Sequence, residues 1–288
     1  MGIPAYNEEK NIASIILQLK KITNTIIVCN DGSEDLTGSI AKELGVIVEN
    51  HSKNIGYGGA IKTLFLKARE LQVDVLVTFD ADGQHHVEDI EKVIEPTIKN
   101  DADIVIGSRF GTNNDDIPKY RKVGIKTITG LTNASTGTKI TDAQSGFRAY
   151  SKKVLEKIHP SEQGMGVSTE ILIKAAKQKF KITEVPIKIS YEGNTSTHEP
   201  VSHGTSVVLS TIKFVSIENP LKFYGLPGIF FLGIGLYFML LTIQIFGDSR
   251  DIFTNYAIVG IGGIITGTLF LLTAIILYTT VSVVREQR

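Results

Sequence analysis

The 288-residue sequence has one cysteine, no excess of charge of either sign and no sign of a signal peptide. A single cysteine excludes an intrachain disulfide framework, and Cys29, within the apolar run 26–29, is expected to be a small core residue in a reducing compartment. The 30 basic and 30 acidic residues cancel, so the overall charge gives no reason to expect nucleic acid as a partner. Because the first residues lack a continuous apolar run, the amino-terminal domain is expected to be cytoplasmic.

The densest group of oxygen-bearing side chains follows the apolar run 73–79, which is typical of a parallel strand buried on both faces. Asp80 and Asp82 come next, and their spacing places both carboxylates on one side of an extended backbone. Gln84 adds a neutral oxygen beyond the turn-forming Gly83. An isolated Asp-x-Asp is more often a solvated acidic turn. The motifs described below favour instead a site for Mg²⁺ or Mn²⁺, which prefer oxygen ligands and complete their shells with substrate phosphates.

Strand-like and helix-like segments alternate through most of the chain. Strands are predicted for the apolar runs at 2–5, 26–29, 46–49, 73–79 and 103–110. Most segments between them have apolar residues at helical spacing; further along, 117–136 is predicted to be a basic helix and 182–191 is strand-like. This alternation predicts an α/β domain with a doubly wound, mostly parallel sheet. Ligands of such sheets bind beyond the carboxyl ends of the strands, which is where the polar turns of this sequence fall.

The end of the chain is apolar. Residues 226–246 and 256–284 contain no charged side chain, and each stretch is long enough to cross a bilayer as a helix. Lysines and arginines flank the two stretches, while the loop between them has only Arg250. Because loops rich in Lys and Arg stay on the inner side, both termini are predicted to be cytoplasmic. The expected organisation is an α/β domain at 1–204, an interfacial amphipathic segment at 205–224 and a two-helix transmembrane hairpin at 225–288.

Six motifs stand in a fixed order: IPAYNEEKNI, NDGSEDLT, NIGYGGA, FDADGQH, GSRF and DAQSGFRAY. As an ordered set they resemble the inverting family 2 glycosyltransferases with the GT-A fold, and most closely the polyprenyl-phosphate sugar transferases typified by dolichyl-phosphate mannose synthases. The resemblance covers about residues 1–220 and extends through ENPLKFYGLPG into the apolar stretches. It implies transfer of a hexose, with mannose favoured, from GDP-mannose or UDP-glucose to dolichyl or polyprenyl phosphate at a lipid bilayer.

The resemblance also implies where the donor binds. It places the nucleotide cleft after the first strand, at Pro4, Ala5, Tyr6 and Glu8. It implies that Asp31 contacts the base, although Asn30 stands where many relatives have a second aspartate. The metal, Mg²⁺ or Mn²⁺, would bind the diphosphate through Asp82 and Gln84, with Asp80 beside them.

The remaining implied roles concern catalysis and the acceptor. Arg109 matches a position that lines the active site and Arg121 one that faces the lipid phosphate, so both are expected, with Asp82, to be catalytic. Gln144 and Arg148 belong to the acceptor-side loop by the same resemblance. For Arg148, a role in stapling that loop is an equally good interpretation.

Three alternatives remain open. One is a UDP-glucose-dependent polyprenyl-phosphate glucosyltransferase. Another is a polysaccharide-type transferase with a hydroxyl acceptor, which would need a general base that Glu170 could supply, whereas an acceptor phosphate is already largely ionised. The third is a membrane-tethered nucleotide-binding scaffold, a hypothesis that Asn30 favours and that the intact set of Asp80, Asp82 and Gln84 opposes.

Overall fold

The chain forms two compact units, Met1–Thr211 and Ile212–Arg288, and each is described by itself. The computed structural model describes residues 1–110, 119–190, 209, 212–213, 215–217, 219–249 and 254–286, and only the backbone of 119–121, 248–249 and 284–286. The finer division of the chain at 204 and 224 stays a prediction.

A seven-stranded sheet forms the centre of the first unit, in the order β3-β2-β1-β4-β6-β5-β7. Its strands are β1 (Gly2–Ala5), β2 (Ile27–Asn30), β3 (Ile47–Asn50), β4 (Val75–Thr78), β5 (Ile104–Ser108), β6 (Arg148–Ser151) and β7 (Ile182–Pro186). The first four are parallel, β5 is parallel to β7, and β6 runs antiparallel between β4 and β5. The predicted mostly parallel α/β sheet is confirmed, with β6 as its one reversed strand among the described residues.

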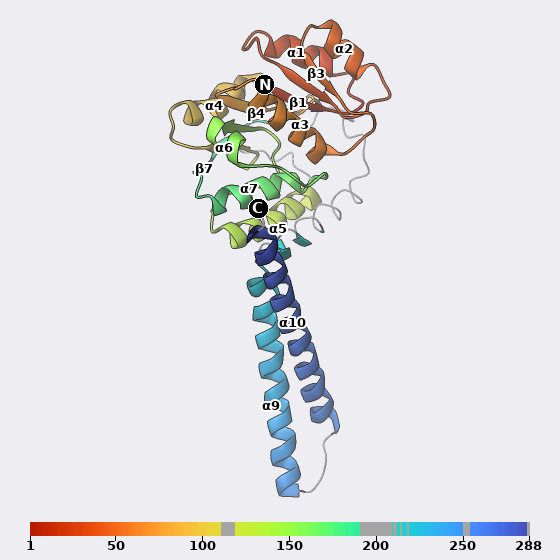
Figure 1. The fold of residues 1–288 in the computed structure, drawn as a ribbon, viewed down its shortest axis with the longest axis vertical. Coiled ribbons are helices and arrows are strands. Elements are labelled where there is room, and N and C mark those ends of the chain that lie inside the picture. Colours follow the sequence, from red (N-terminus) through yellow and green to blue (C-terminus); the bar gives the residue numbers. More distant parts are fainter. Residues whose placement is uncertain are drawn as a thin grey trace. The chain divides into compact units, whose positions relative to one another are not determined.

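Helices cover both faces of this sheet (Figure 1). They are α1 (Ile12–Leu19), α2 (Thr37–Glu43), α3 (Tyr57–Glu70), α4 (Ile90–Ile98), α5 (Lys119–Thr136), α6 (Lys152–Lys157) and α7 (Val167–Lys177). One core layer packs α1, α2 and α4 against strand residues such as Val28 and Val77, and the other packs α3, α6 and α7 against Cys29 and Leu76. Successive strand residues alternate between the layers, as the pleat requires. Both faces are therefore buried, which explains the continuous apolar runs in the sequence.

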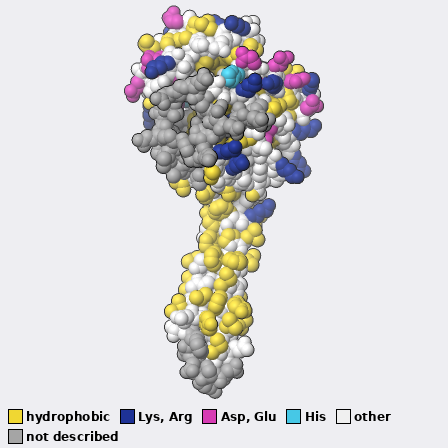
Figure 2. All heavy atoms as spheres, turned by 180° about the vertical axis from the view of Figure 1, so that it is seen from behind, with side chains coloured by type: hydrophobic (Ala, Val, Ile, Leu, Met, Phe, Trp, Pro, Cys, Tyr) yellow, Lys and Arg dark blue, Asp and Glu magenta, His cyan; other side chains and the backbone are white. Residues whose placement is uncertain are grey.

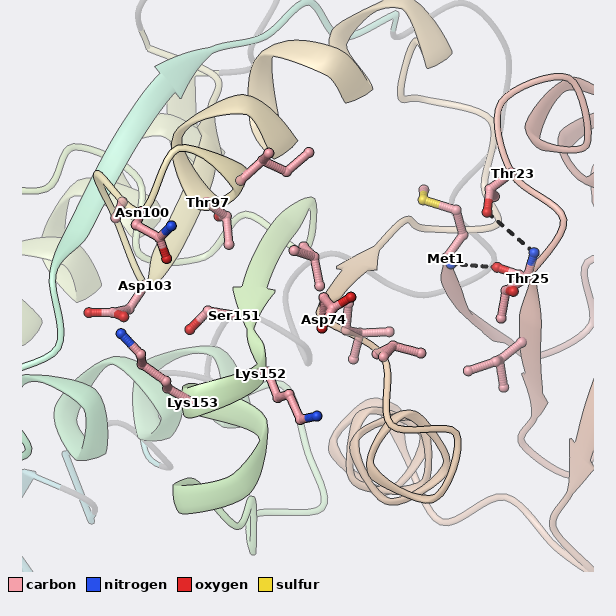
Figure 3. A pocket seen from close by; sticks show the side chains of 16 residues that line it. Met1, Thr23, Thr25, Asp74, Thr97, Asn100, Asp103, Ser151, Lys152 and Lys153 are labelled. Carbon is pink, nitrogen blue, oxygen red and sulfur yellow. Dashed lines mark hydrogen bonds between the residues drawn. The ribbon is translucent and has the colours of Figure 1, made fainter.

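A cavity of about 650 Å³ lies beside the amino ends of β1 and β4 (Figure 3). Met1, Thr25 and Asp74 line it, and the Met1 amine donates to the Thr25 carbonyl at 2.7 Å. Burial lowers the pKa of this amine to about 6. The cavity is at the opposite end of the strands from Asp80 and Asp82, which follow the carboxyl end of β4. It is therefore not the donor site that the sequence predicts.

Two long helices, α9 (Leu226–Ser249) and α10 (Thr254–Glu286), make up most of the second unit and lie side by side (Figure 1). A π-helical turn at Leu221–Gly225 precedes them. Gly235 lies so close to the backbone of Gly263 that a Cβ would be 2.8 Å from its carbonyl carbon, so only glycine allows this approach. Hydrophobic side chains cover the helices (Figure 2). Leu221–Gly247 and Thr254–Val283, each with a mean hydropathy of 2.2, are candidate membrane spans.

Candidate active site

The candidate site lies where β1, β2 and β4 end, because these strands are neighbours in the sheet and run in the same direction. Glu8 follows β1, and Asp80 and Asp82 follow β4. The pKa of Glu8 is raised to about 7, first by burial and then by the nearby carboxylates of Asp82, Asp35 and Asp80, while a hydrogen bond from Asn11 opposes the shift. Three predicted site residues are thus gathered into one acidic cluster.

Asp80 is held by two side chains from different segments. The Tyr57 hydroxyl donates to its Oδ1 at 3.1 Å, and the His85 ring donates from Nε2 to its Oδ2 at 3.3 Å. Burial would raise the pKa of Asp80, but the hydrogen bond and charge of His85 and the bond from Tyr57 lower it below its ordinary value. The charge of Arg109 acts in the same direction. Asp80 is therefore an ionised carboxylate with a fixed orientation.

The turn after Asp80 presents the predicted metal ligands. Gly83 has a φ of +74°, a conformation that suits glycine. This turn lets the backbone amide of Gln84 donate to Asp82 Oδ1 at 3.0 Å. The described residues contain no group of three or more His, Cys, Asp or Glu arranged around a metal position. Even so, Asp82 and Gln84 carry hard oxygens. Asp82 also lies near Glu8, whose pKa is raised first by burial and then by the charge of Asp82 and its neighbours. Such a set fits Mg²⁺ or Mn²⁺ completed by phosphates.

Asp31 lies at the end of β2 and is 3 % exposed. Its carboxylate accepts hydrogen bonds from His51 Nδ1 at 2.6 Å and from the backbone amides of Ile55 and Gly56 at 3.0 and 2.8 Å. Gly56 has a φ of +103°, which favours glycine at this position. Asp31 thus connects the glycine-rich turn at Ile55 and Gly56 to the end of β2. Its contact with the nucleotide base stays a prediction.

The other residues predicted for the nucleotide cleft lie close to Asp31. Pro4 and Ala5 are buried in β1, where the Ala5 carbonyl accepts the amide of Asp31 at 2.9 Å. Tyr6 follows and is half-buried. The backbone of β1 and the start of the turn after β2 are thus joined here, and a nucleotide cleft at Pro4, Ala5 and Tyr6 stays a prediction. Asn30 donates from its side-chain amide to Asn50 Oδ1 at 2.9 Å, a bond that an aspartate at this position could not donate.

Arg109 forms a two-pronged ion pair with Asp142. Its Nε and Nη2 donate to the two carboxylate oxygens, both at 2.6 Å, and its backbone amide adds a bond of 3.2 Å. Asp142 is completely buried. Burial would raise the pKa of Asp142, but the charge and hydrogen bonds of Arg109 hold it below its ordinary value. Arg109 is thereby fixed near Asp80, and its proposed catalytic role stays a prediction.

Arg148 is 1 % exposed and donates to three backbone carbonyls, those of Ser145, Ser168 and Ala143, at 2.7, 2.9 and 2.7 Å. The guanidinium of Arg148 faces the protein interior, where it satisfies two carbonyls of the preceding loop and one of α7. The contacts of Arg148 are those of a loop staple, and the predicted contact of Arg148 with substrate is not seen. Gln144, from the same loop, is half-buried and donates to Thr169 Oγ1 at 2.9 Å.

Glu170, the alternative general base, is completely buried in α7. It accepts bonds from Ser161 and from the Glu162 amide and pairs with Lys174 at 2.6 Å. A carboxylate enclosed in this way has no access to a hydroxyl acceptor. Arg121 lies in α5, but its side chain is outside the described residues, so its predicted contact with the acceptor is not addressed.

Sequence reasoning missed Tyr57, His85, Gly146 and Asp142 as parts of the site. Each lies within or beside a motif that the sequence analysis singled out. Tyr57 and Asp142 have partners that are far away in sequence, Asp80 and Arg109, whereas His85 bonds Asp80 only five residues away. The signal was present in the motifs, but the pairing could not be read from spacing alone.

Comparisons with known proteins identify the family. Residues 1–159 match the family described as Glycosyl transferase family 2. A UDP-N-acetylglucosamine–dolichyl-phosphate N-acetylglucosaminyltransferase of Methanococcus voltae is 39% identical over 229 residues, which span 72% of this chain and 89% of the relative. A polyprenol monophosphomannose synthase of Mycolicibacterium smegmatis is 33% identical over 198 residues, spanning 64% and 74%.

The fold has solved counterparts. Glucosyl-3-phosphoglycerate synthase from Mycobacterium tuberculosis, in complex with Mn²⁺, uridine diphosphate and phosphoglyceric acid, has a TM-score of 0.57 over 74% of this chain and 77% of its own, at 18% identity. At that identity the likeness concerns the fold alone. The family match covers more than half of the chain. This protein therefore belongs to glycosyl transferase family 2 and is a glycosyltransferase.

Proposed function

We propose that this glycosyltransferase transfers a hexose, with inversion, from a nucleoside diphosphate sugar to dolichyl or another polyprenyl phosphate. The observation that carries the proposal is the convergence of Glu8, Asp80 and Asp82 in a chain with two candidate membrane spans. An acidic cluster of this kind suits a metal–diphosphate donor, and membrane spans suit an acceptor with a lipid tail. The names of the two relatives, which specify dolichyl phosphate and polyprenol, support the same acceptor class.

On the donor side, Asp82 and Gln84 would hold Mg²⁺ or Mn²⁺, with Asp80 beside them. When bound, such an ion neutralises charge on the leaving diphosphate. Complexes of the structural counterpart with Mn²⁺ or Mg²⁺ and uridine diphosphate support metal use in the family. Asp31, at the end of β2, would contact the base of the nucleotide. Arg109 adds positive charge near Asp80.

On the acceptor side, a phosphate monoester with a second pKa of about 6 is already largely a dianion at neutral pH and needs little help from a base. The burial of Glu170 agrees with this, because a hydroxyl acceptor would require an accessible base. Arg121 in the basic helix α5 would orient the acceptor phosphate, since a guanidinium binds phosphate through paired hydrogen bonds without removing a proton.

The sugar and the topology are finer parts of the proposal. Mannose from GDP-mannose is favoured by the motif resemblance, and UDP-glucose is the alternative; the Methanococcus voltae relative is named for a third donor, UDP-N-acetylglucosamine. The two candidate spans would anchor the protein in the membrane, with both termini cytoplasmic because Lys213, Lys222 and Arg285 flank them.

A transfer assay tests the proposal. Membranes containing the protein are incubated with each of the three labelled donors and polyprenyl phosphate, with and without a chelator, and the lipid product is analysed. We expect one donor to give a lipid-phosphate sugar only when metal is present, and Asp82→Ala to abolish its formation. Arg121→Ala should raise the KM for polyprenyl phosphate and leave donor affinity unchanged. Product formation in excess chelator would refute the metal site, and transfer to a sugar hydroxyl alone would refute the acceptor class.

A further inference from the structure

Both carboxylate oxygens of Asp80 are occupied by protein side chains, Oδ1 by the Tyr57 hydroxyl and Oδ2 by the His85 ring. We propose that Tyr57 and His85 are positioning residues that fix the Asp80 carboxylate for the donor diphosphate and thereby set the affinity for the nucleotide. This inference rests on the proposed function and assigns two further residues to the same site.

Tyr57 has little freedom to move. It begins α3 directly after Gly56, and the next two amides, of Gly58 and Gly59, donate to the Gln163 carbonyl at 2.7 and 3.3 Å. Burial and then the charge of Asp80 raise the pKa of its phenol well above the ordinary value. Tyr57 therefore remains protonated and donates its hydrogen to Asp80 at any working pH.

His85 occupies a position where stability alone would favour an apolar residue. Its side chain is 6 % exposed and packs against Phe79 and Phe147, with ring centroids 5.6 and 5.1 Å away. Its Nδ1 is buried and has no hydrogen-bond partner. A buried polar atom without a partner is unfavourable, and phenylalanine would fill the same space without one. What only histidine supplies here is the bond from Nε2 to Asp80.

The backbone of Gly146 closes a third side of the carboxylate. A Cβ added there would be 2.5 and 2.8 Å from the two oxygens of Asp80, and closer still to the Tyr57 hydroxyl. Asp80 is therefore enclosed on three sides, and rotating its carboxylate would break both hydrogen bonds. Its side chain is nevertheless 25 % exposed. The exposed part is presented in one fixed orientation, which lowers the entropic cost of binding a ligand.

Nucleotide binding, rather than sugar transfer, tests this inference. Full-length protein in detergent is titrated calorimetrically with UDP and with GDP in the presence of Mn²⁺, for the wild type, Tyr57→Phe and His85→Phe. We expect each substitution to weaken binding of the preferred nucleotide about tenfold, because the Asp80 carboxylate is then no longer held in its binding orientation and the cost of ordering it falls on binding. Thermal unfolding separates the roles: His85→Phe removes the unpaired Nδ1 as well as the bond to Asp80, so the two effects offset each other and its Tm should stay near that of the wild type.

Two controls establish that the effect passes through Asp80. Both substitutions are repeated in an Asp80→Asn background, where positioning predicts that their effect on affinity largely disappears. His86→Phe is the matched control, because this neighbouring histidine bonds Ser190 Oγ at 2.9 Å and not Asp80. The nucleotide affinity of this variant should stay at the wild-type value.

The outcomes are distinct. Unchanged affinity in Tyr57→Phe and His85→Phe, or an equal loss in the Asp80→Asn background, would overturn the positioning role and leave the proposed function standing. A lower Tm with unchanged affinity would make both residues purely structural. If the wild type binds neither nucleotide with Mn²⁺, the proposed donor class fails and this inference fails with it.

Discussion

Arg148 gives the most discriminating test, because sequence reasoning allowed it either to contact substrate or to staple a loop. It is 1 % exposed and donates to the carbonyls of Ala143, Ser145 and Ser168. Arg148→Met keeps much of the side-chain volume and removes all three donors. Arg148→Lys keeps the charge, but an ammonium cannot reproduce the planar fork that spans three carbonyls.

The magnitude follows from those contacts. Hydrogen bonds that involve a charged group contribute about 1.5–3 kcal/mol each, so three give about 5–9 kcal/mol. Burying the guanidinium offsets several kcal/mol of this, a penalty that methionine does not have. A net loss of about 2–4 kcal/mol is expected for Arg148→Met. In a domain of this size, 1 kcal/mol shifts Tm by about 2–4 °C, so Tm should fall by about 4–16 °C.

Unfolding is measured by far-ultraviolet circular dichroism on the full chain in detergent, since the sequence has no tryptophan for fluorescence. Arg148→Lys should also lower Tm, by less than Arg148→Met. At a temperature where both variants remain folded, the KM for polyprenyl phosphate should stay near the wild-type value. A Tm within about 2 °C of the wild type together with a large rise in this KM would refute the loop-stapling role and favour a direct contact of Arg148 with substrate.

Four further predictions concern Gly146, Glu8 and Glu170. Gly146→Ala should reduce transfer at least tenfold because the added Cβ collides with Asp80, whereas Gly130→Ala, with open space around it, should be silent in the same assay. The affinity for Mn²⁺ should rise from pH 6 to pH 8, because Glu8 with its pKa of about 7 becomes charged in that range, and Glu8→Gln should flatten the profile in a titration followed by electron paramagnetic resonance. Because the pKa of Glu8 is raised in the folded state, its contribution to stability falls as pH rises from about 4.5 to 7, and Glu8→Gln should weaken this trend in Tm. Glu170→Gln should lower Tm by several degrees and leave transfer by the folded enzyme intact; unchanged Tm with abolished transfer would make Glu170 a base.

The parts of the fold that were predictable are those set by local pattern. Runs of apolar residues predicted the positions of β2 and β4. Apolar residues three and four positions apart predicted α1, because a helix that buries one face repeats its apolar residues at that spacing. The strand β6 was missed. It has only four residues and begins with Arg148, and a charged residue argues against a strand buried on both sides. Arg148 is stabilised there by three carbonyls, those of Ala143 and Ser145 in the preceding loop and that of Ser168 in α7, and the contact with Ser168 is not encoded in any local pattern.

The same distinction applies to the site. The acidic residues Asp80 and Asp82 were predictable because two side chains after one strand share a side of the backbone. The partners of Asp80 were not, since Tyr57 and His85 reach it from another helix and from the following turn. Arg109 was expected near the active site, but its pairing with Asp142 depends on a contact across 33 residues.

The reversed strand β6 has a consequence for how enzymes of this design diversify. Because β6 runs antiparallel beside β4, the loop that leads into it arrives at the same edge where β4 ends, and Gly146 comes to rest against Asp80. Under the proposed function, this loop would contact the acceptor while Gly146 limits the space around the carboxylate that faces the donor. A substitution that changes the loop would then also displace Asp80, so acceptor and donor specificity would evolve together, with compensating changes around Tyr57 and His85.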